Sequence, residues 1–299
     1  MLGDDKSCLW HTERTEITQC FKERNEMNTT INEMSKMNNC NQKIIIKNYE
    51  NDFASDFINL ASKYDAVENY IQKMAEAKVR SLIVNGPSGL GKTYSVNAYL
   101  EKYAKGNFKI ISGHMTVMSL YVALYAYRES GKILVLDDVD SVFSKLEGLN
   151  ILKAVMDTTE KRTVHWASSS HILSNMGIPQ SFNYCGGVVL ISNIGFGGEK
   201  SKVLAHLNAL KDRSYCIPIA DGSEESLFKQ VCFMVLKRGL LTKMGVEEGA
   251  QLRLLNYIEL NKKKLTTISL RTLYKLAEIY KMDSDNWEDM ANQGLLKGV

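Results

Sequence analysis

The sequence predicts an α/β fold, in which a doubly wound, five-stranded parallel sheet is followed by an all-helical region. Two observations lead to this prediction. Up to about residue 220, short apolar runs alternate with segments whose apolar residues recur every three or four positions, which is the order that builds a parallel sheet. Beyond residue 220 the helical spacing continues and we expect no further strands.

The expected strands are apolar runs bounded by glycine or polar residues. Helices cover both faces of a parallel sheet, so its strands are nearly continuous hydrophobic segments rather than alternating ones. The runs that fit are residues 81–84, 108–112, 132–138, 186–193 and 215–220.

Helical spacing fills the segments around these strands. Residues 53–77 predict a long helix before the first strand, and residues 201–210 predict one before the last. The stretch between residues 160 and 186 is long for a turn and leaves room for a small hairpin. Asp221 and Glu224 suggest a capping box at the start of the helical region. Further helices are expected at 248–260, 268–281 and 284–295.

Composition changes along the chain suggest three parts. Residues 1–45 are polar, without sustained apolar periodicity, and are expected to be a partly disordered or helical extension. Residues 46–220 are expected to form the α/β domain, and residues 221–299 a helical lid domain.

The overall composition is that of an ordinary globular protein. The chain has 299 residues, of which 44% are hydrophobic and 24% charged, and its net charge of +3 does not by itself point to nucleic acid. No apolar run has the length of a membrane span, and the first residues lack a signal-peptide pattern. The six cysteines include no C-x-x-C pair, as is typical of reduced thiols. We therefore expect a cytoplasmic protein without a membrane partner, in the host cytoplasm if the chain is viral.

The stretch "NGPSGLGKTY" at residues 85–94 has the form G-x-x-x-x-G-K-[ST]. It lies between an expected strand and an expected helix, which is the context in which backbone N–H groups cradle phosphates. Lys92 is the expected partner of the β- and γ-phosphates, and Thr93 the expected Mg²⁺ ligand. The predicted nucleotide-binding residues of this loop are Gly86, Pro87, Ser88, Gly89, Leu90, Gly91, Lys92, Thr93 and Tyr94.

A second motif, "ILVLDD", suggests hydrolysis as well as binding. Its apolar residues place Asp137 at the carboxyl end of a strand, where a parallel sheet has its ligand site. Asp137 is then expected beside the Mg²⁺ held by Thr93, and Asp138 is the candidate general base for the attacking water. An acidic turn after a strand is the structural alternative.

With these two motifs, residues 50–285 resemble the AAA+ family of ATPases. The family usually has glutamate where this chain has Asp138, although some of its replication initiators and helicase loaders carry an Asp–Asp pair. The resemblance implies that Asn193 is a sensor-1 residue that orients the water, Arg213 an arginine finger that acts on a neighbouring subunit, and Arg271 a sensor-2 residue that contacts phosphate. A strand-ending asparagine and two solvated arginines are the alternatives. The layout of residues 137–193 is also similar to that of small bacteriophage AAA+ ATPases.

The resemblance implies an enzyme that binds and hydrolyses ATP with Mg²⁺ in a homo-oligomer, expected to be a ring such as a hexamer. We expect it to serve DNA transactions of the replication or helicase-loading type. A protein-remodelling subunit with a protein client, and an ATP-gated scaffold with weak turnover, are the alternatives. Basic clusters at 237–238 and 262–264 are candidate contacts for nucleic acid, or solvated helix ends. Residues 112–118 are a candidate pore loop, in which Thr116 alternatively caps a helix.

Overall fold

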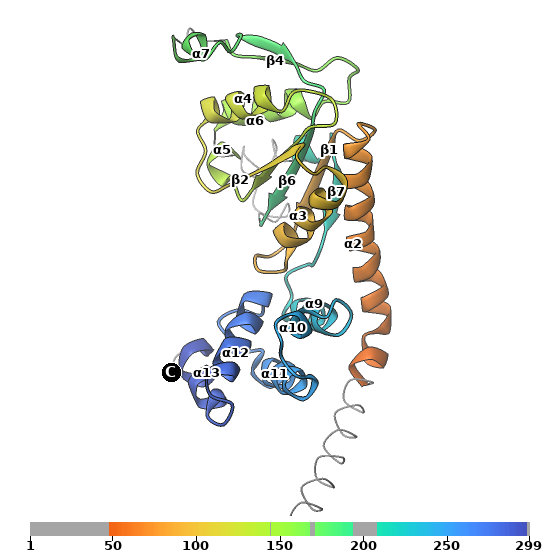
Figure 1. Ribbon diagram of the computed structural model, residues 1–299, viewed down its shortest axis with the longest axis vertical. Helices are drawn as coiled ribbons and strands as arrows, with labels where there is room; N and C mark the ends of the chain where they lie inside the picture. Colours follow the sequence, from red (N-terminus) through yellow and green to blue (C-terminus); the bar gives the residue numbers. More distant parts are fainter. Residues whose placement is uncertain (1–47, 144, 168–170, 194–207, 298–299) are drawn as a thin grey trace, which may run out of the picture.

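The computed structural model describes residues 48–143, 145–167, 171–193 and 208–297. Figure 1 shows a sheet with its covering helices at one end, a group of helices at the other, and helix α2 (Ala54–Ala75) running beside both. The predicted extension at residues 1–45 and most of the helix predicted at 201–210 lie outside the described residues.

The larger sheet is parallel and has five strands in the order β2-β3-β6-β1-β7. The register of the parallel strands places the carboxyl ends of the inner strands along one edge of the sheet. Asn85 pairs with Ser192, and Asp137 pairs with Ile191. The predicted fold class is therefore confirmed. The strands are β1 (Ser81–Asn85), β2 (Phe108–Ser112), β3 (Ile133–Asp137), β6 (Gly187–Ser192) and β7 (Tyr215–Pro218).

Hydrophobic side chains cover both faces of this sheet. In β3, Ile133 and Val135 belong to a buried cluster with α2 and α3, whereas Leu134 and Leu136 belong to a second buried cluster with α4 and α6. Alternate residues of a strand point to opposite faces, so a strand buried on both faces has to be apolar throughout. The helices after the strands are α3 (Lys92–Tyr103), α4 (Val117–Ala126), α5 (Asp140–Phe143) and α6 (Leu146–Val155).

A small antiparallel hairpin lies between α6 and β6, as the length of this stretch suggested. It consists of β4 (Thr163–His165) and β5 (Ser181–Asn183), with the short helix α7 (His171–Asn175) between them. The guanidinium of Arg162, at the base of the hairpin, is buried and donates to the carbonyl oxygens of Val155 and Gly186. These bonds attach the hairpin to the end of α6 and to the residue before β6.

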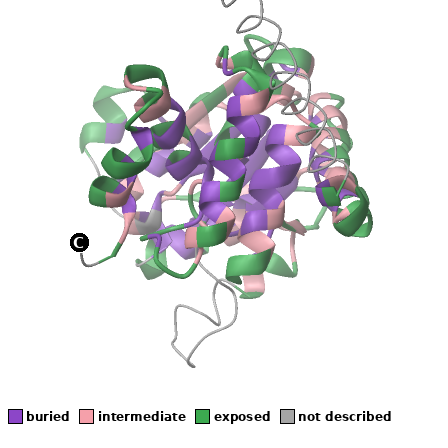
Figure 2. Cartoon of the chain, turned by 90° about the horizontal axis from the view of Figure 1, so that it is seen from below, coloured by how far each residue is buried: buried purple, intermediate pink, exposed green. Residues whose placement is uncertain are grey.

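The helices beyond residue 220 are called the lid. They are α9 (Glu224–Leu236), α10 (Leu240–Lys243), α11 (Glu248–Asn261), α12 (Leu270–Met282) and α13 (Trp287–Leu295). The predicted capping box is wrong, because Ser223 caps α9 by accepting a hydrogen bond from the Ser226 N–H, while Asp221 accepts hydrogen bonds from Ser223. Figure 2 shows the buried parts of the helices facing inward and the exposed parts at the rim.

Helix α2 connects the sheet to the lid. Its buried residues join one hydrophobic cluster that contains one face of the sheet and the inner faces of the lid helices. Ion pairs join α2 and the helical residues before it to α9 and the two residues after it: Asp56 to Lys229 (3.0 Å), Glu50 to Lys237 (2.6 Å) and Asp65 to Arg238 (3.6 Å). Because the two parts share a core, the division into domains at residue 220 stays a prediction.

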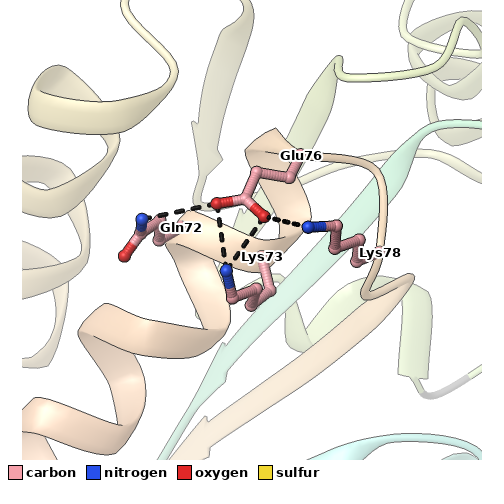
Figure 3. A network of polar contacts seen from close by, with 4 residues as sticks. All are labelled: Gln72, Lys73, Glu76 and Lys78. Atoms are coloured by element: carbon pink, nitrogen blue, oxygen red, sulfur yellow. Dashed lines mark hydrogen bonds and ion pairs between the residues drawn. The ribbon is translucent and has the colours of Figure 1, made fainter.

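The end of α2 carries an exposed polar network, shown in Figure 3. Glu76, which follows the helix, accepts hydrogen bonds from Lys73 and Gln72 and pairs with Lys78 at 2.8 Å. The ammonium groups of Lys78 and Lys73 lower the pKa of Glu76 to about 2. The network fixes the turn that leads from α2 into β1.

Candidate functional site

The loop between β1 and α3 has the backbone shape that its glycines predict. Gly86, Gly89 and Gly91 have φ angles of 149°, 72° and 80°, which residues with a side chain rarely adopt. Space is also restricted at Gly89, where a Cβ would lie 2.9 Å from the Cβ of Ser269 in the lid. The loop is thus in direct contact with the lid.

Lys92 begins α3 and is 6% exposed. Its Nζ donates hydrogen bonds of 2.8 Å to the carbonyl oxygens of Gly86 and Pro87 and to Asn193 Oδ1. Burial lowers the pKa of the Lys92 ammonium, and two nearby carboxylates oppose this shift. Lys92 is therefore a partly desolvated cation held inside the loop, where an anionic phosphate oxygen is a stronger partner than a carbonyl.

Asp137 ends β3 and is 9% exposed. The Thr93 hydroxyl lies 3.0 Å from both carboxylate oxygens, and the Ser112 hydroxyl donates to Oδ2 at 3.3 Å. Burial raises the pKa of Asp137, against the effect of the Thr93 hydrogen bond. A carboxylate beside hydroxyl groups is a donor set that suits Mg²⁺, so Thr93 and Asp137 fit the metal. Ser112 is missing from the sequence-based set, and its only signal is its place at the end of a strand.

Asp138 has a left-handed backbone, with a φ of 51°, which costs a residue with a side chain about 1–2 kcal/mol. Its N–H donates to the Ile191 carbonyl at 3.0 Å, which ties it to β6. Asn193 Nδ2 donates to Asp138 Oδ2 at 2.7 Å, so Asn193 connects Lys92 to Asp138. The second oxygen, Oδ1, is buried and has no hydrogen-bond partner among the described residues. It is an acceptor of the kind that a general base needs.

These side chains line one cleft of about 330 Å³ between the loop and the lid. One end is polar and contains Lys92, Thr93, Asp137, Asp138 and Asn193. The lid contributes an apolar wall that the sequence did not reveal. In the sequence, these residues look like ordinary core residues of helices, and only their tertiary contacts place them at the cleft. This wall consists of Met234, Leu240, Met244, Leu270 and Tyr274. The polar end suits phosphates, and the apolar wall suits the nucleoside.

Arg271 and Tyr94 also line this cleft, and both are exposed. The N–H of Leu270 donates to the Gly89 carbonyl at 2.8 Å, which fixes the start of α12 on the loop and places Arg271 at the cleft. The roles predicted for Arg271 and Tyr94 stay predictions.

Arg213 lies away from this cleft. It precedes β7, and its carbonyl accepts a hydrogen bond from the side chain of Ser81, the first residue of β1. It therefore sits at the amino ends of these strands, whereas the loop follows their carboxyl ends. Its Nη1 donates to the Ala209 carbonyl, and its Nε is buried without a partner among the described residues. Arg213 does not reach the nucleotide cleft of its own chain.

Two buried polar residues that the sequence did not reveal hold the loop from behind. The Tyr64 hydroxyl, on α2, donates to the Leu90 carbonyl at 3.1 Å and accepts a hydrogen bond of 2.6 Å from Gln230 of α9. Burial raises the pKa of Tyr64, which keeps the hydroxyl protonated as a donor. Both residues occupy positions that the helical spacing assigns to the core. The sequence therefore predicts their burial but not their hydrogen bonds.

A strand, a glycine loop with a buried lysine, and a hydroxyl–carboxylate pair between α3 and the end of β3 define a nucleotide-binding protein of the P-loop class. Residues 82–179 match the family model "ATPase family associated with various cellular activities (AAA)". A 36.7 kDa protein from the nrdC–mobD intergenic region of Enterobacteria phage T4 is 34% identical over 219 residues, which are 71% of this chain and 67% of that protein. The chain belongs to the AAA+ family of P-loop ATPases.

Solved structures with a similar fold have low identity. The RuvB Holliday junction branch migration motor of Thermotoga maritima is 13% identical with a TM-score of 0.46, over 79% of this chain and 68% of that chain. Domain III of the Thermotoga maritima replication initiation protein DnaA is 15% identical with a TM-score of 0.46, over 80% of this chain and 92% of that chain. Likeness at this level says nothing about function. Within the described part of the chain, no helix is both long and apolar enough to span a membrane.

Proposed function

We propose that this chain hydrolyses ATP with Mg²⁺ to drive conformational work in an oligomer that serves DNA transactions of the replication or helicase-loading type. The proposal depends above all on the hydrogen-bonded series Lys92–Asn193–Asp138 beside the Thr93–Asp137 pair. Binding alone does not require an unpartnered carboxylate oxygen beside the phosphate loop, whereas hydrolysis does require a base for water. A cytoplasmic location, in the host cytoplasm if the chain is viral, belongs to this proposal because such DNA transactions take place there.

Each polar residue of the nucleotide cleft has its own role in the proposed hydrolysis. Thr93 and Asp137 would hold Mg²⁺, which would neutralise part of the charge on the β- and γ-phosphate oxygens. Lys92 exchanges its carbonyl partners for phosphate oxygens. Asp138 Oδ1 takes a proton from the water whose oxygen attacks the γ-phosphorus, while Asn193 holds the carboxylate in place. The bond from phosphorus to the β–γ bridging oxygen breaks, giving ADP and inorganic phosphate, and the proton passes from Asp138 to solvent.

Arg213 is proposed to complete the site of a neighbouring subunit. Its place at the amino ends of the strands supports action in trans, because no cleft residue of its own chain lies there. A planar guanidinium with several donors suits the charge that develops on a transferring phosphoryl group. An oligomer follows from this role, with a closed ring such as a hexamer as the expected form.

The two basic clusters give unequal support to nucleic acid as the partner. Lys237 and Arg238 pair with acidic residues of α2 and of the helical residues before it, so they are engaged within the chain. Lys263 and Lys264 are exposed and form no ion pair with any described residue. Exposed lysines of this kind attract the phosphate backbone of nucleic acids.

The candidate pore loop favours nucleic acid over a protein client. Met115 is 6% exposed, and its N–H donates to the Ser141 hydroxyl at 3.0 Å, so this part of the loop is attached to the chain's own core. Thr116 caps α4 by accepting a hydrogen bond from the Ser119 N–H. A loop held in this way presents little apolar side chain to a threading polypeptide.

Phosphate release from ATP by the purified full chain tests this proposal. The wild type should release phosphate only with Mg²⁺ and faster when single-stranded or duplex DNA is added, with the stimulation falling as salt rises. Lys92→Ala should lower the rate at least about 100-fold, whereas Lys105→Ala, an exposed lysine outside the cleft, should not.

Other outcomes separate the alternatives. Stimulation by an unfolded protein but not by DNA would replace the nucleic-acid partner with a protein client. Absence of turnover in every oligomeric fraction would contradict hydrolysis and leave a nucleotide-gated scaffold.

A further inference from the structure

A second cleft, of about 430 Å³, adjoins the nucleotide cleft and shares Ser88 and Arg271 with it. Apart from Ser88 and Pro87, its walls come from the lid, so we call it the lid cleft. Of the lid residues that line it, only Arg271 and Lys262 of the basic cluster 262–264 have been given a candidate functional role above.

The lid cleft is strongly basic. Its charged lining residues are four cations, Lys262, Arg271, Lys275 and Lys297, and one acid, Glu224. None of the four cations forms an ion pair with a described residue, although lysines elsewhere in the same lid, such as Lys229, do so. Unpaired cations that converge on one concave surface repel one another, and an anion placed among them removes that repulsion.

The framework that presents these cations is held by hydrogen bonds. The Lys297 N–H donates to the Lys264 carbonyl at 2.8 Å, and the N–H and hydroxyl of Thr266 both donate to the Leu295 carbonyl at 3.1 Å. The Thr272 hydroxyl of α12 donates to the Thr267 carbonyl at 2.8 Å. The loop before α12 and the end of the chain are therefore tied together, so that Lys262 and Lys297 face one cleft from adjoining segments.

The chemistry of the lining favours phosphates over bases. No aromatic side chain is among the described residues that line the lid cleft, whereas single-strand binders that hold bases stack them on aromatic rings. Lysine and arginine contacts to phosphate oxygens need no base and carry no sequence information. We propose that the lid cleft binds the phosphodiester backbone of nucleic acid, without reading its bases.

This inference rests on the proposed DNA function and gives it a location. Arg271 lines both clefts, so a backbone phosphate in the lid cleft and a nucleotide phosphate share one guanidinium. Nucleic acid bound there would act directly on a residue at the nucleotide. DNA would then stimulate ATP turnover through Arg271 itself, without a structural change transmitted between distant sites.

Binding of a fluorescent 30-base-pair duplex and a 30-nucleotide single strand to the full-length protein tests the site. The test variant is Lys262→Glu/Lys275→Glu/Lys297→Glu, which leaves every residue of the nucleotide cleft in place. The control is Lys105→Glu/Lys109→Glu/Lys161→Glu, which makes the same change of net charge at exposed lysines outside the lid. ATP binding and thermal unfolding show whether each variant is folded.

The lid-cleft variant should bind both DNAs at least about tenfold more weakly, and its salt slope on the duplex should shrink by about 2–3, since each phosphate contact contributes about 0.9. The control should stay close to the wild type. If the triple variant fails to fold, Lys275→Gln alone should weaken binding about two- to fivefold.

Three results would overturn the assignment. If the lid-cleft variant and the control bind DNA equally well, the lid cleft is not the binding site, but the proposed DNA function still holds. Absence of DNA binding by the wild type, with or without nucleotide, would instead remove the DNA function itself. Inorganic tripolyphosphate that binds the wild type and not the lid-cleft variant, without DNA doing so, would make the ligand a small phosphate compound.

Discussion

Asp138 combines a strained backbone with an unpartnered carboxylate oxygen. Its φ of 51° places it in a region that aspartate tolerates better than most residues, and the Ile191 carbonyl and the Asn193 amide hold it there. Strain kept in this way at a ligand site is typical of a functional residue. The shorter side chain, where the family usually has glutamate, is therefore positioned by the backbone as well as by its length.

Asp138→Asn should separate ATP binding from hydrolysis. The amide keeps the size of the side chain but accepts no proton, so we expect turnover to fall about 10²- to 10⁴-fold while binding of a fluorescent ATP analogue stays near the wild-type level. Asp52→Asn, an exposed carboxylate remote from the cleft, should change neither quantity. Unchanged turnover in Asp138→Asn would remove Asp138 as the base.

At the scale of single elements, the phosphate loop and α12 depend on each other. The carbonyl oxygen of Gly89 accepts a hydrogen bond from the Leu270 N–H. Because Gly89 has no Cβ, Ser269 can lie directly against it. The start of α12 is thus held by the same loop that holds phosphate. A change in the loop on nucleotide binding would be passed to the lid through this contact.

Gly89→Ala and Gly106→Ala form a matched pair that tests this contact. Both glycines have a positive φ, 72° and 78°, but a Cβ at Gly106 meets nothing within 4 Å. Gly106→Ala should lower the free energy of unfolding by about 1–2 kcal/mol through backbone strain. Gly89→Ala should lower it by about 1–3 kcal/mol more, and should also weaken ATP binding. Equal losses in denaturant titrations would show that the lid does not depend on this contact.

The network at the end of α2 predicts an acid-dependent difference in stability. Lys78 and Lys73 lower the pKa of Glu76 from 4.5 to about 2, so the ionised carboxylate stabilises the fold above pH 4.5 and loses this effect as the pH falls towards 2. Glu76→Gln should therefore be less stable than the wild type at pH 7. The difference should shrink below pH 4.5 and disappear near pH 2, as measured by denaturant unfolding. Glu101→Gln, an exposed residue without an ion pair among the described residues, should show no such trend.

The elements that could be predicted are those whose residues form a recognisable pattern along the sequence. The inner strands β1, β3 and β6 were visible because both of their faces are buried, and the less buried edge strands β2 and β7 because they are short apolar runs. Lys92, Thr93, Asp137 and Asp138 were visible because they lie at or after the ends of strands, at the ligand edge of the sheet. Ser112, Tyr64 and Gln230 were missed, because each acts through a partner that is distant in sequence. Asp221 was misassigned because its side chain bonds the true cap, Ser223, two residues later.

At the scale of the whole molecule, the position of Arg213 bears on whether one chain could form a complete site for the proposed hydrolysis. Its bonds to Ser81 and Ala209 hold it at the end of the sheet opposite the phosphate loop. If Arg213 is the arginine finger that we propose, the nucleotide cleft and the finger of a single chain face different neighbouring subunits.

Mixing two inactive variants tests this arrangement. Lys92→Ala lacks a working phosphate loop but keeps Arg213, and Arg213→Ala has the reverse defect. Each should hydrolyse ATP poorly alone, whereas an equal mixture should regain activity, since about a quarter of the interfaces then pair an intact loop with an intact finger. A mixture that stays as inactive as its components, while size-exclusion chromatography shows mixed oligomers, would contradict action in trans.

Helix α2 has a consequence for how the protein melts. One face of the sheet and the inner faces of the lid helices belong to a single hydrophobic cluster that this helix completes. Removal of the lid would expose that cluster to water, so the remaining chain would lose part of the core that keeps the phosphate loop in shape. Heating should accordingly unfold the sheet and the lid in one calorimetric transition. The protein would thus move its lid as a folded body, without a partly melted state between its nucleotide-bound forms.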